Sequence, residues 1–99
     1  MAITTQAFIQ APFVTKNAKG VAAATVVKAS KGYVGSVTVA VAGSSLGAIY
    51  DHATTSGVGN SNLIFSIPET VGTYTVNFPT LSGITVVPGT GMTVAVSFA

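Results

Sequence analysis

The sequence predicts an all-β fold, an antiparallel β-sandwich or jelly-roll-like barrel of about six to eight short strands with an extended N-terminal arm. Apolar and polar residues alternate over several runs, which is the period of a half-buried strand. Turns rich in Pro and Gly separate these runs at short intervals. No segment of about ten residues or more has the helical period of about 3.6 residues.

Three runs, residues 33–41, 72–78 and 92–98, show the clearest alternation. Val, Tyr, Phe and Met fill one set of positions, and Thr, Ser and Asn fill most of the other. Each run therefore predicts a strand with one face in the core. The residues expected to share that face are, run by run, Tyr33, Gly35, Val37, Val39 and Val41; Tyr74, Val76 and Phe78; and Met92, Val94, Val96 and Phe98.

Residues 46–53, 63–67 and 83–87 are shorter runs or are apolar on both faces. Strands of this kind are covered on both sides, and we expect the core on one side and a neighbouring subunit on the other. Residues 22–29 predict a further strand, although Ala favours strands less than β-branched residues do. Pro88-Gly89-Thr90-Gly91, between two strand-like runs, predicts a hairpin.

The first 20 residues differ from the rest of the chain. We expect an extended N-terminal arm over residues 1–20 and a β-sandwich domain over residues 21–99. Residues 7–14 carry two phenylalanines, and residues 15–20 are typical of a polar, lysine-bearing loop. An apolar arm should dock on its own sheet or on a neighbouring copy, since arm exchange interlocks small assemblies. A locally packed first strand is an equally weighted alternative.

Charged residues are scarce and form 6% of the chain, against about 25% in typical globular proteins. Acid–base, nucleophilic and metal chemistry need convergent ionisable groups, and the chain has no Cys. We therefore expect no enzyme, no metal site and no cofactor. Surface charge keeps soluble proteins apart, so we also expect a homo-oligomer or larger assembly. A monomer with a neutral Ser/Thr surface is the alternative. The charged residues are Lys16, Lys19, Lys28, Lys31, Asp51 and Glu69.

Asp51 and His52 form the one acid–histidine pair in the chain. Adjacent residues on a strand point to opposite faces, so a catalytic site would need both of them and Glu69 to converge in a cleft. No Gly-x-Ser-x-Gly motif is present. We expect a structural role for Asp51, whose carboxylate can accept backbone N–H groups from the loop that follows it.

Tyr33, Tyr50 and Tyr74 raise the alternative of a carbohydrate-stacking platform, for which all three would have to lie exposed on one face. Packing in the core or at an interface is the default for such residues. The four lysines cluster between residues 16 and 31, but the chain has no Arg, so we expect no direct nucleic-acid partner.

No apolar stretch approaches the roughly 18 residues of a membrane-spanning helix. The N-terminus lacks the basic region of a signal peptide. We expect no membrane partner.

Residues 28–98 contain a series of motifs in a specific order. They are KASKGYVGSVTV, GAIYD, NLIFSIP, GTYTVNF, SGITVV and MTVAVSF, with Gly- and Ser-containing turns between them. This order resembles small all-β virion proteins of tailed bacteriophages that decorate or cement the capsid, or form fibres on it. The chain departs from some of these proteins in lacking an acidic surface.

The resemblance implies a homotrimer on the capsid exterior, with the major capsid protein as partner and with no catalytic residues. The expected function is capsid decoration; the alternatives are a head-fibre or tail accessory protein and a carbohydrate or cell-surface binding module. We expect the shell, or a neighbouring decoration subunit, to meet Phe8, Ile9, Phe13, Lys16 and Lys19. We expect self-association through Ile49, Tyr50, Ile64 and Phe65.

Overall fold

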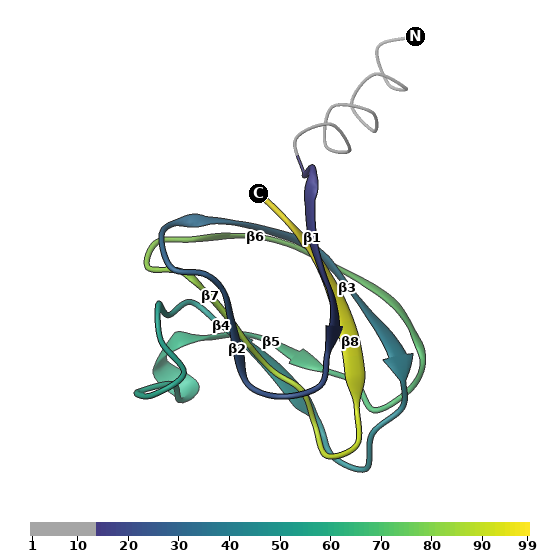
Figure 1. The fold of residues 1–99 in the computed structure, drawn as a ribbon. Helices are drawn as coiled ribbons and strands as arrows, with labels where there is room; N and C mark the ends of the chain where they lie inside the picture. The colour runs from purple at the N-terminus through teal and green to yellow at the C-terminus, as the bar shows by residue number, and fades with distance from the viewer. Residues whose placement is uncertain (1–13) are drawn as a thin grey trace, which may run out of the picture.

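The computed structural model describes residues 14–99, which form eight strands and one 3₁₀ turn (Figure 1). Residues 1–13, which include Phe8, Ile9 and Phe13 of the predicted arm, lie outside the described residues. In chain order the elements are β1 (Lys16–Val21), β2 (Thr25–Lys28), β3 (Gly32–Val41), β4 (Gly47–Tyr50), η1 (Asn60–Asn62), β5 (Leu63–Ile67), β6 (Gly72–Thr80), β7 (Ile84–Val87) and β8 (Thr93–Phe98).

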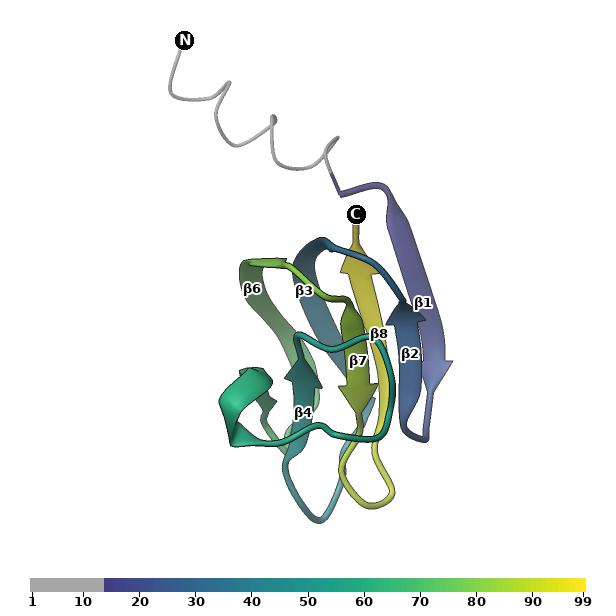
Figure 2. The same ribbon diagram turned by 90° about the vertical axis from the view of Figure 1, so that its left-hand side faces the viewer.

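The strands pair into two antiparallel sheets that face each other. The first sheet has the order β1-β8-β3-β6, and the second has the order β2-β7-β4-β5. The predicted all-β sandwich is therefore confirmed. Figure 2 shows β1 and β2 side by side at one flank, which we call the β1–β2 side. The opposite flank is the β5–β6 side, where residues 68–71 connect the two edge strands.

The core lies between the sheets and consists mostly of Val and Ile. These β-branched side chains are stiff and pack well on a pleated surface. Burying each one contributes about 1.5–3 kcal/mol. The alternation predicted for residues 92–98 is confirmed by β8 and the residue before it. The buried apolar residues are Val21, Val34, Val37, Val39, Ile49, Ile67, Ile84, Val86, Met92, Val94, Val96 and Phe98.

A bulge in β3 shifts the inward face of that strand by one residue. The pairing of β3 with both of its neighbours changes register between Val34 and Ser36. Val34 is buried before the bulge, and Val37 and Val39 are buried after it. One extra residue reverses the faces of a strand, so the predicted place of Tyr33 and Gly35 on the core face is wrong.

Val41, the last residue that the alternation of β3 predicts for the core, lies at the strand end and is 51% exposed. Its predicted burial is also wrong. The pairing of β3 with β8 changes register between Val39 and Val41, so the alternation that buries Val37 and Val39 does not extend to Val41.

A second irregularity lies in β6, an edge strand of the first sheet. Thr75 pairs with Ser36 and Phe78 with Val34, so two residues of β6 face Gly35 alone. Asn77, one of these two, has a φ of 48°, a left-handed conformation that Asn tolerates better than most residues. Phe78 is 48% exposed, so its predicted place in the core is wrong, because no strand of residues 14–99 pairs with the outer edge of β6.

Residues 15–20, predicted as a loop, mostly form a strand. β1 pairs with β8, with Lys16 opposite Phe98 and Val21 opposite Val94. The loop prediction is wrong because backbone hydrogen bonds hold an edge strand, which can therefore carry polar side chains. The expected boundary between residues 20 and 21 falls inside β1. β2 and β4 are shorter than the predicted runs 22–29 and 46–53.

β7 is covered on both faces, as its sequence predicts, and the cover on the outer face comes from the chain itself. Ile84 and Val86 point into the core, whereas Thr85 lies between them and is still 0% exposed. Its Oγ1 donates to the carbonyl oxygens of His52 (2.8 Å) and Thr54 (3.3 Å). The loop after β4 therefore occupies the place where a neighbouring subunit was expected.

Gly89 tests the packing of the β7–β8 turn against the turn before β4. A Cβ at Gly89 would overlap the carbonyl oxygen of Ser45. We expect Gly89→Ala to lower the free energy of unfolding by about 1–3 kcal/mol through overpacking, measured by urea denaturation. The control is Gly59→Ala, at an extended φ of −177° with nothing within 4 Å of the added Cβ. Equal losses in the two variants would contradict the prediction.

Candidate interaction surface

Asp51, directly after β4, holds the turn between β6 and β7. Its Oδ1 accepts hydrogen bonds from the backbone N–H groups of Ser82 (2.8 Å), Leu81 (3.1 Å) and Gly83 (3.3 Å). Desolvation raises the pKa of this carboxyl, but the three backbone donors, helped by His52, outweigh it and hold the pKa below its ordinary value of 3.8. Asp51 thus has a structural role, with donors from a more distant turn than the sequence suggested.

A catalytic site would also need His52 and Glu69 to converge with Asp51, and their side chains do not. His52 faces its own loop, with Nδ1 3.0 Å from the carbonyl oxygen of Thr54. Glu69 accepts a backbone hydrogen bond from Gly43 (3.3 Å) near the start of β4, whereas Asp51 and His52 follow the end of that strand. Within one copy the three groups do not converge. Residues 14–99 also contain no group of three or more His, Cys, Asp or Glu placed to hold a metal ion.

The three tyrosines lie on different surfaces. Tyr74 packs against the core, and its hydroxyl donates to the carbonyl oxygen of Thr70 (2.8 Å). Tyr50 alternates with the buried Ile49 and so faces outward from the second sheet, while Tyr33 faces outward from the first. The single-face platform that carbohydrate stacking requires is not formed.

Lys16, Lys19 and Lys28 lie on the β1–β2 side, whereas Lys31 lies near Pro79, Thr80 and Leu81 at the end of β6. Lys16 and Lys19 are exposed on β1, Lys28 ends β2 half-buried, and Lys31 is exposed in the turn that follows. No acidic residue occurs between residues 14 and 31. This side of the sandwich therefore carries a concentrated positive charge that would attract an acidic partner.

The β5–β6 side has the opposite character. Neither strand contains a charged residue, and residues 72–76 of β6 precede the Asn77 bulge and Pro79. Lys, Pro and bulges are the usual protection of a sheet edge, so β5 and residues 72–76, which we call the neutral edge surface, are open to strand pairing. Exposed apolar side chains lie on it or beside it: Leu63 at 37% and Val71 at 63%.

The structure separates the residues predicted for self-association. Ile49 is fully buried against the opposite sheet, so its assignment to a contact surface is wrong. Tyr50, Ile64 and Phe65 are half-buried, and the latter two pack against the core. Only β5 therefore places any of this set on the neutral edge surface. Lys16 and Lys19 are exposed on the other side of the molecule.

The sequence prediction missed two features of the surface. They are the open edge of β6 and the exposed apolar side chains of Leu63, Val71 and Leu81. One signal for them was available. Residues 53–99 contain a single charged residue, Glu69, so any surface that they form is nearly neutral. The sequence did not show which part of this segment forms a sheet edge, because strand order depends on pairings between distant residues.

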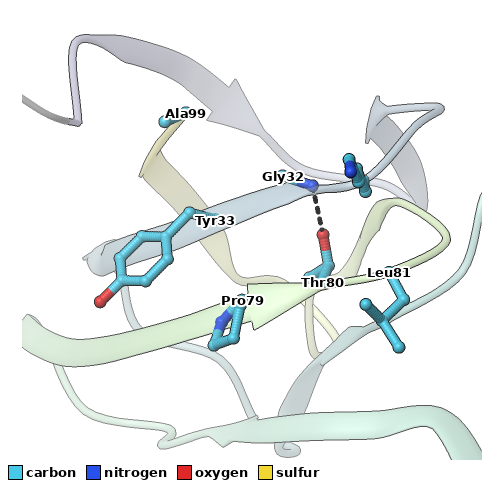
Figure 3. Close-up of a pocket in the computed structure, with 7 residues that line it drawn as sticks. Gly32, Tyr33, Pro79, Thr80, Leu81 and Ala99 are labelled. Atoms are coloured by element: carbon cyan, nitrogen blue, oxygen red, sulfur yellow. Dashed lines mark hydrogen bonds between the residues drawn. The ribbon is translucent and has the colours of Figure 1, made fainter.

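An open apolar hollow of about 460 Å³ lies where β3 begins and where β6 and β8 end (Figure 3). The Gly32 N–H donates to Thr80 Oγ1 (2.9 Å), so these two polar groups of the lining satisfy each other. The remaining lining is almost wholly apolar apart from the side chain of Lys31. The lining residues are Lys31, Gly32, Tyr33, Pro79, Thr80, Leu81 and Ala99.

Fold and surface together define a two-sheet β-sandwich with one basic side and one neutral side. No protein-family model matches the chain, and comparisons with curated proteins and with solved structures find no significant match. Among residues 14–99, no helix has the length and hydropathy needed to cross a membrane. Function is therefore inferred from the sequence and the geometry.

Asp51→Asn tests the carboxylate that holds the 81–83 turn. We expect the free energy of unfolding at pH 7 to fall by about 1–2 kcal/mol, because neutral hydrogen bonds replace charged ones at a partly solvated site. In the wild type this contribution is present above pH 3.8 and is lost as the pH falls through the lower folded-state pKa. The variant should lose less stability over that acid range. Urea denaturation at each pH measures both effects.

Glu69→Gln is the matched control for Asp51→Asn, because Glu69 is the other carboxylate of the chain and its side chain is exposed. It should retain the stability of the wild type at pH 7. Wild-type stability of Asp51→Asn at both neutral and acid pH would show that the carboxylate does not hold the turn.

Proposed function

We propose that this protein is a non-enzymatic virion component, a capsid decoration (cement) protein that stabilises a phage head. Its contacts are between its own copies and between each copy and the shell. The proposed partner is the major capsid protein of the same particle, the proposed state is a homotrimer, and the proposed location is the capsid exterior. The resemblance of residues 28–98 to small all-β virion proteins supports this proposal, together with the surface of the sandwich.

The observation that carries the proposal is the separation of Lys16, Lys19 and Lys28 from the neutral edge surface, on opposite sides of one small domain. A protein that coats a particle makes two kinds of contact at once, one with its own copies and one with the shell. Two chemically different sides meet this requirement. Many weak contacts on a repeating lattice then add through effective concentration.

The neutral edge surface suits the contact between copies. Addition of a strand to an open sheet edge supplies main-chain hydrogen bonds and needs no charged side chain. Exposed ion pairs contribute only about 0–1 kcal/mol each, so their scarcity here removes little binding energy. The lysines on the β1–β2 side suit an acidic patch on the shell.

The alternatives differ in how far the structure supports them. A head-fibre or tail accessory protein would use the same two sides, and the position of the protein on the virion distinguishes this role from decoration. A carbohydrate-binding module has lost its main support, because Tyr33, Tyr50 and Tyr74 do not share a face.

Thr75→Lys tests self-association through β6. Thr75 is exposed on the open edge. A trimer needs a heterologous contact, so the lysine would act where β6 of one copy pairs with β5 of the next; we expect the wild type to be a trimer by light scattering and the variant to have the mass of a monomer. Asn17→Lys, which adds the same charge to an exposed position of β1, should remain a trimer. A wild type that is monomeric at high concentration would contradict self-association.

Co-sedimentation tests the contact with the shell. The purified chain is mixed with empty shells of the proposed partner, the major capsid protein of the same virion. We expect binding at low salt that weakens as salt rises, because exposed charges are screened over about 10 Å at 0.1 M salt. Lys16→Gln combined with Lys19→Gln should reduce the bound fraction several-fold. Ser66→Gln, on β5, is the control for a surface change on the other side. No binding by the wild type would overturn the decoration role.

A further inference from the structure

The chain that leads into β1 crosses the outer face of the first sheet. Val14 Cγ1 lies 2.8 Å from the position that a Cβ of Gly35 would take, and Ser97 Oγ is also near that position. Ser97 alternates with the buried Val96 and Phe98, so it points outward from the sheet. Val14 therefore lies over β8 and β3 on the outer face of the first sheet. β3 is the second strand from β1 in the order of that sheet.

The apolar hollow opens on this same outer face. Tyr33 and Ala99 exchange backbone hydrogen bonds of 2.9 and 2.8 Å, and each directly neighbours an inward-facing residue, Val34 or Phe98. Tyr33 and Ala99 thus face outward, as does Pro79, which pairs with Tyr33. Traced backward from Lys16 through Val14, the chain moves from β1 across β8 toward the strands that line the hollow.

The distance fits a residue directly before Val14. Tyr33 lies two residues from Gly35 along β3, which is about 7 Å in a strand. The next Cα along the chain lies about 3.8 Å from that of Val14. Phe13 is the residue directly before Val14 in the sequence, and an aromatic side chain extends the reach further.

The chemistry of the hollow suits an aromatic ring better than a polar ligand. Small-molecule sites normally combine apolar walls with a few polar groups that orient the ligand, whereas here Gly32 and Thr80 hydrogen-bond to each other. A cavity of about 150 Å³ is enough to take up benzene, and this hollow has about 460 Å³. Leu81, 82% exposed at its margin, is an apolar side chain with little cover in residues 14–99.

We propose that Phe13 docks in this hollow on its own chain, against Tyr33, Leu81 and Ala99. The contact latches the segment before β1 onto the outer face of the first sheet. It also gives the exposed Leu81 an apolar neighbour. The inference goes beyond the proposed function and does not rest on it, because the docking is within one chain and needs neither a shell nor a second copy.

Nuclear Overhauser spectroscopy of the isotope-labelled full-length chain tests the proposal without any substitution. We expect cross-peaks from the Phe13 ring protons to the methyl groups of Ala99 and Leu81, and none to Leu46. Leu46 is the matched comparison because it is 60% exposed and directly precedes β4. The backbone N–H of Leu81, by contrast, donates to Asp51 after the end of that strand. In a mixture of labelled and unlabelled copies, the filtered spectrum should contain none of these cross-peaks, since the contact is within one chain.

Two variants add a second readout. The chain has no Trp, so Phe13→Trp places a single fluorescent reporter at the proposed contact. We expect blue-shifted emission that moves to longer wavelength when Leu81→Ser is added and does not move when Leu46→Ser is added. Both leucines are exposed, so neither change removes core packing. Absence of the cross-peaks in the wild type would overturn the proposal, and their appearance between copies would replace it by exchange of the segment between subunits.

Discussion

The packing of Val and Ile side chains between the two sheets is the interaction that every other feature depends on. The chain has no Cys and few charges, so neither disulfides nor ion-pair networks replace this packing. Polar groups do not oppose it, because every buried side-chain nitrogen or oxygen in residues 14–99 has a hydrogen-bond partner. Thr80 and Thr85, the buried polar residues of the described chain, each bond to a backbone group. The core thus fixes which strand edges are left open.

The few ionisable groups act locally on that framework. Asp51 follows β4 of the second sheet and binds the turn in which the chain leaves β6 of the first sheet for β7 of the second. One carboxylate therefore fixes a point where the two sheets are connected. The His52 loop performs a similar task for the outer face of β7, through the hydroxyl of Thr85. A chain with only six charged residues can close both sites because backbone groups supply the rest of the hydrogen bonds.

The sandwich itself was predictable because burial of one face imposes a two-residue period, which β8 follows throughout. The bulges in β3 and β6 were not predictable. One extra residue reverses the faces of the strand beyond it, and the alternation of apolar and polar residues does not show where that residue is inserted. The sequence left an arm and a locally packed first strand as alternatives for β1, because the side chains of an edge strand say little about its backbone pairing with β8. The lysine cluster and the nearly neutral segment 53–99 were visible in the sequence, but their placement on opposite edges depends on strand order. The role of Asp51 was predictable in kind, but its partners lie about thirty residues away.

The gathering of Lys16, Lys19 and Lys28 at one flank gives the molecule an electric dipole moment, because Asp51 and Glu69 lie outside that flank. In the field of a negatively charged surface, such a molecule experiences a torque that turns the β1–β2 side toward the surface before contact. The search over orientations, which slows most protein encounters, is then shortened. The neutral edges of β5 and β6 are not the part of the molecule that meets the surface, so they remain accessible to other copies when the molecule lands.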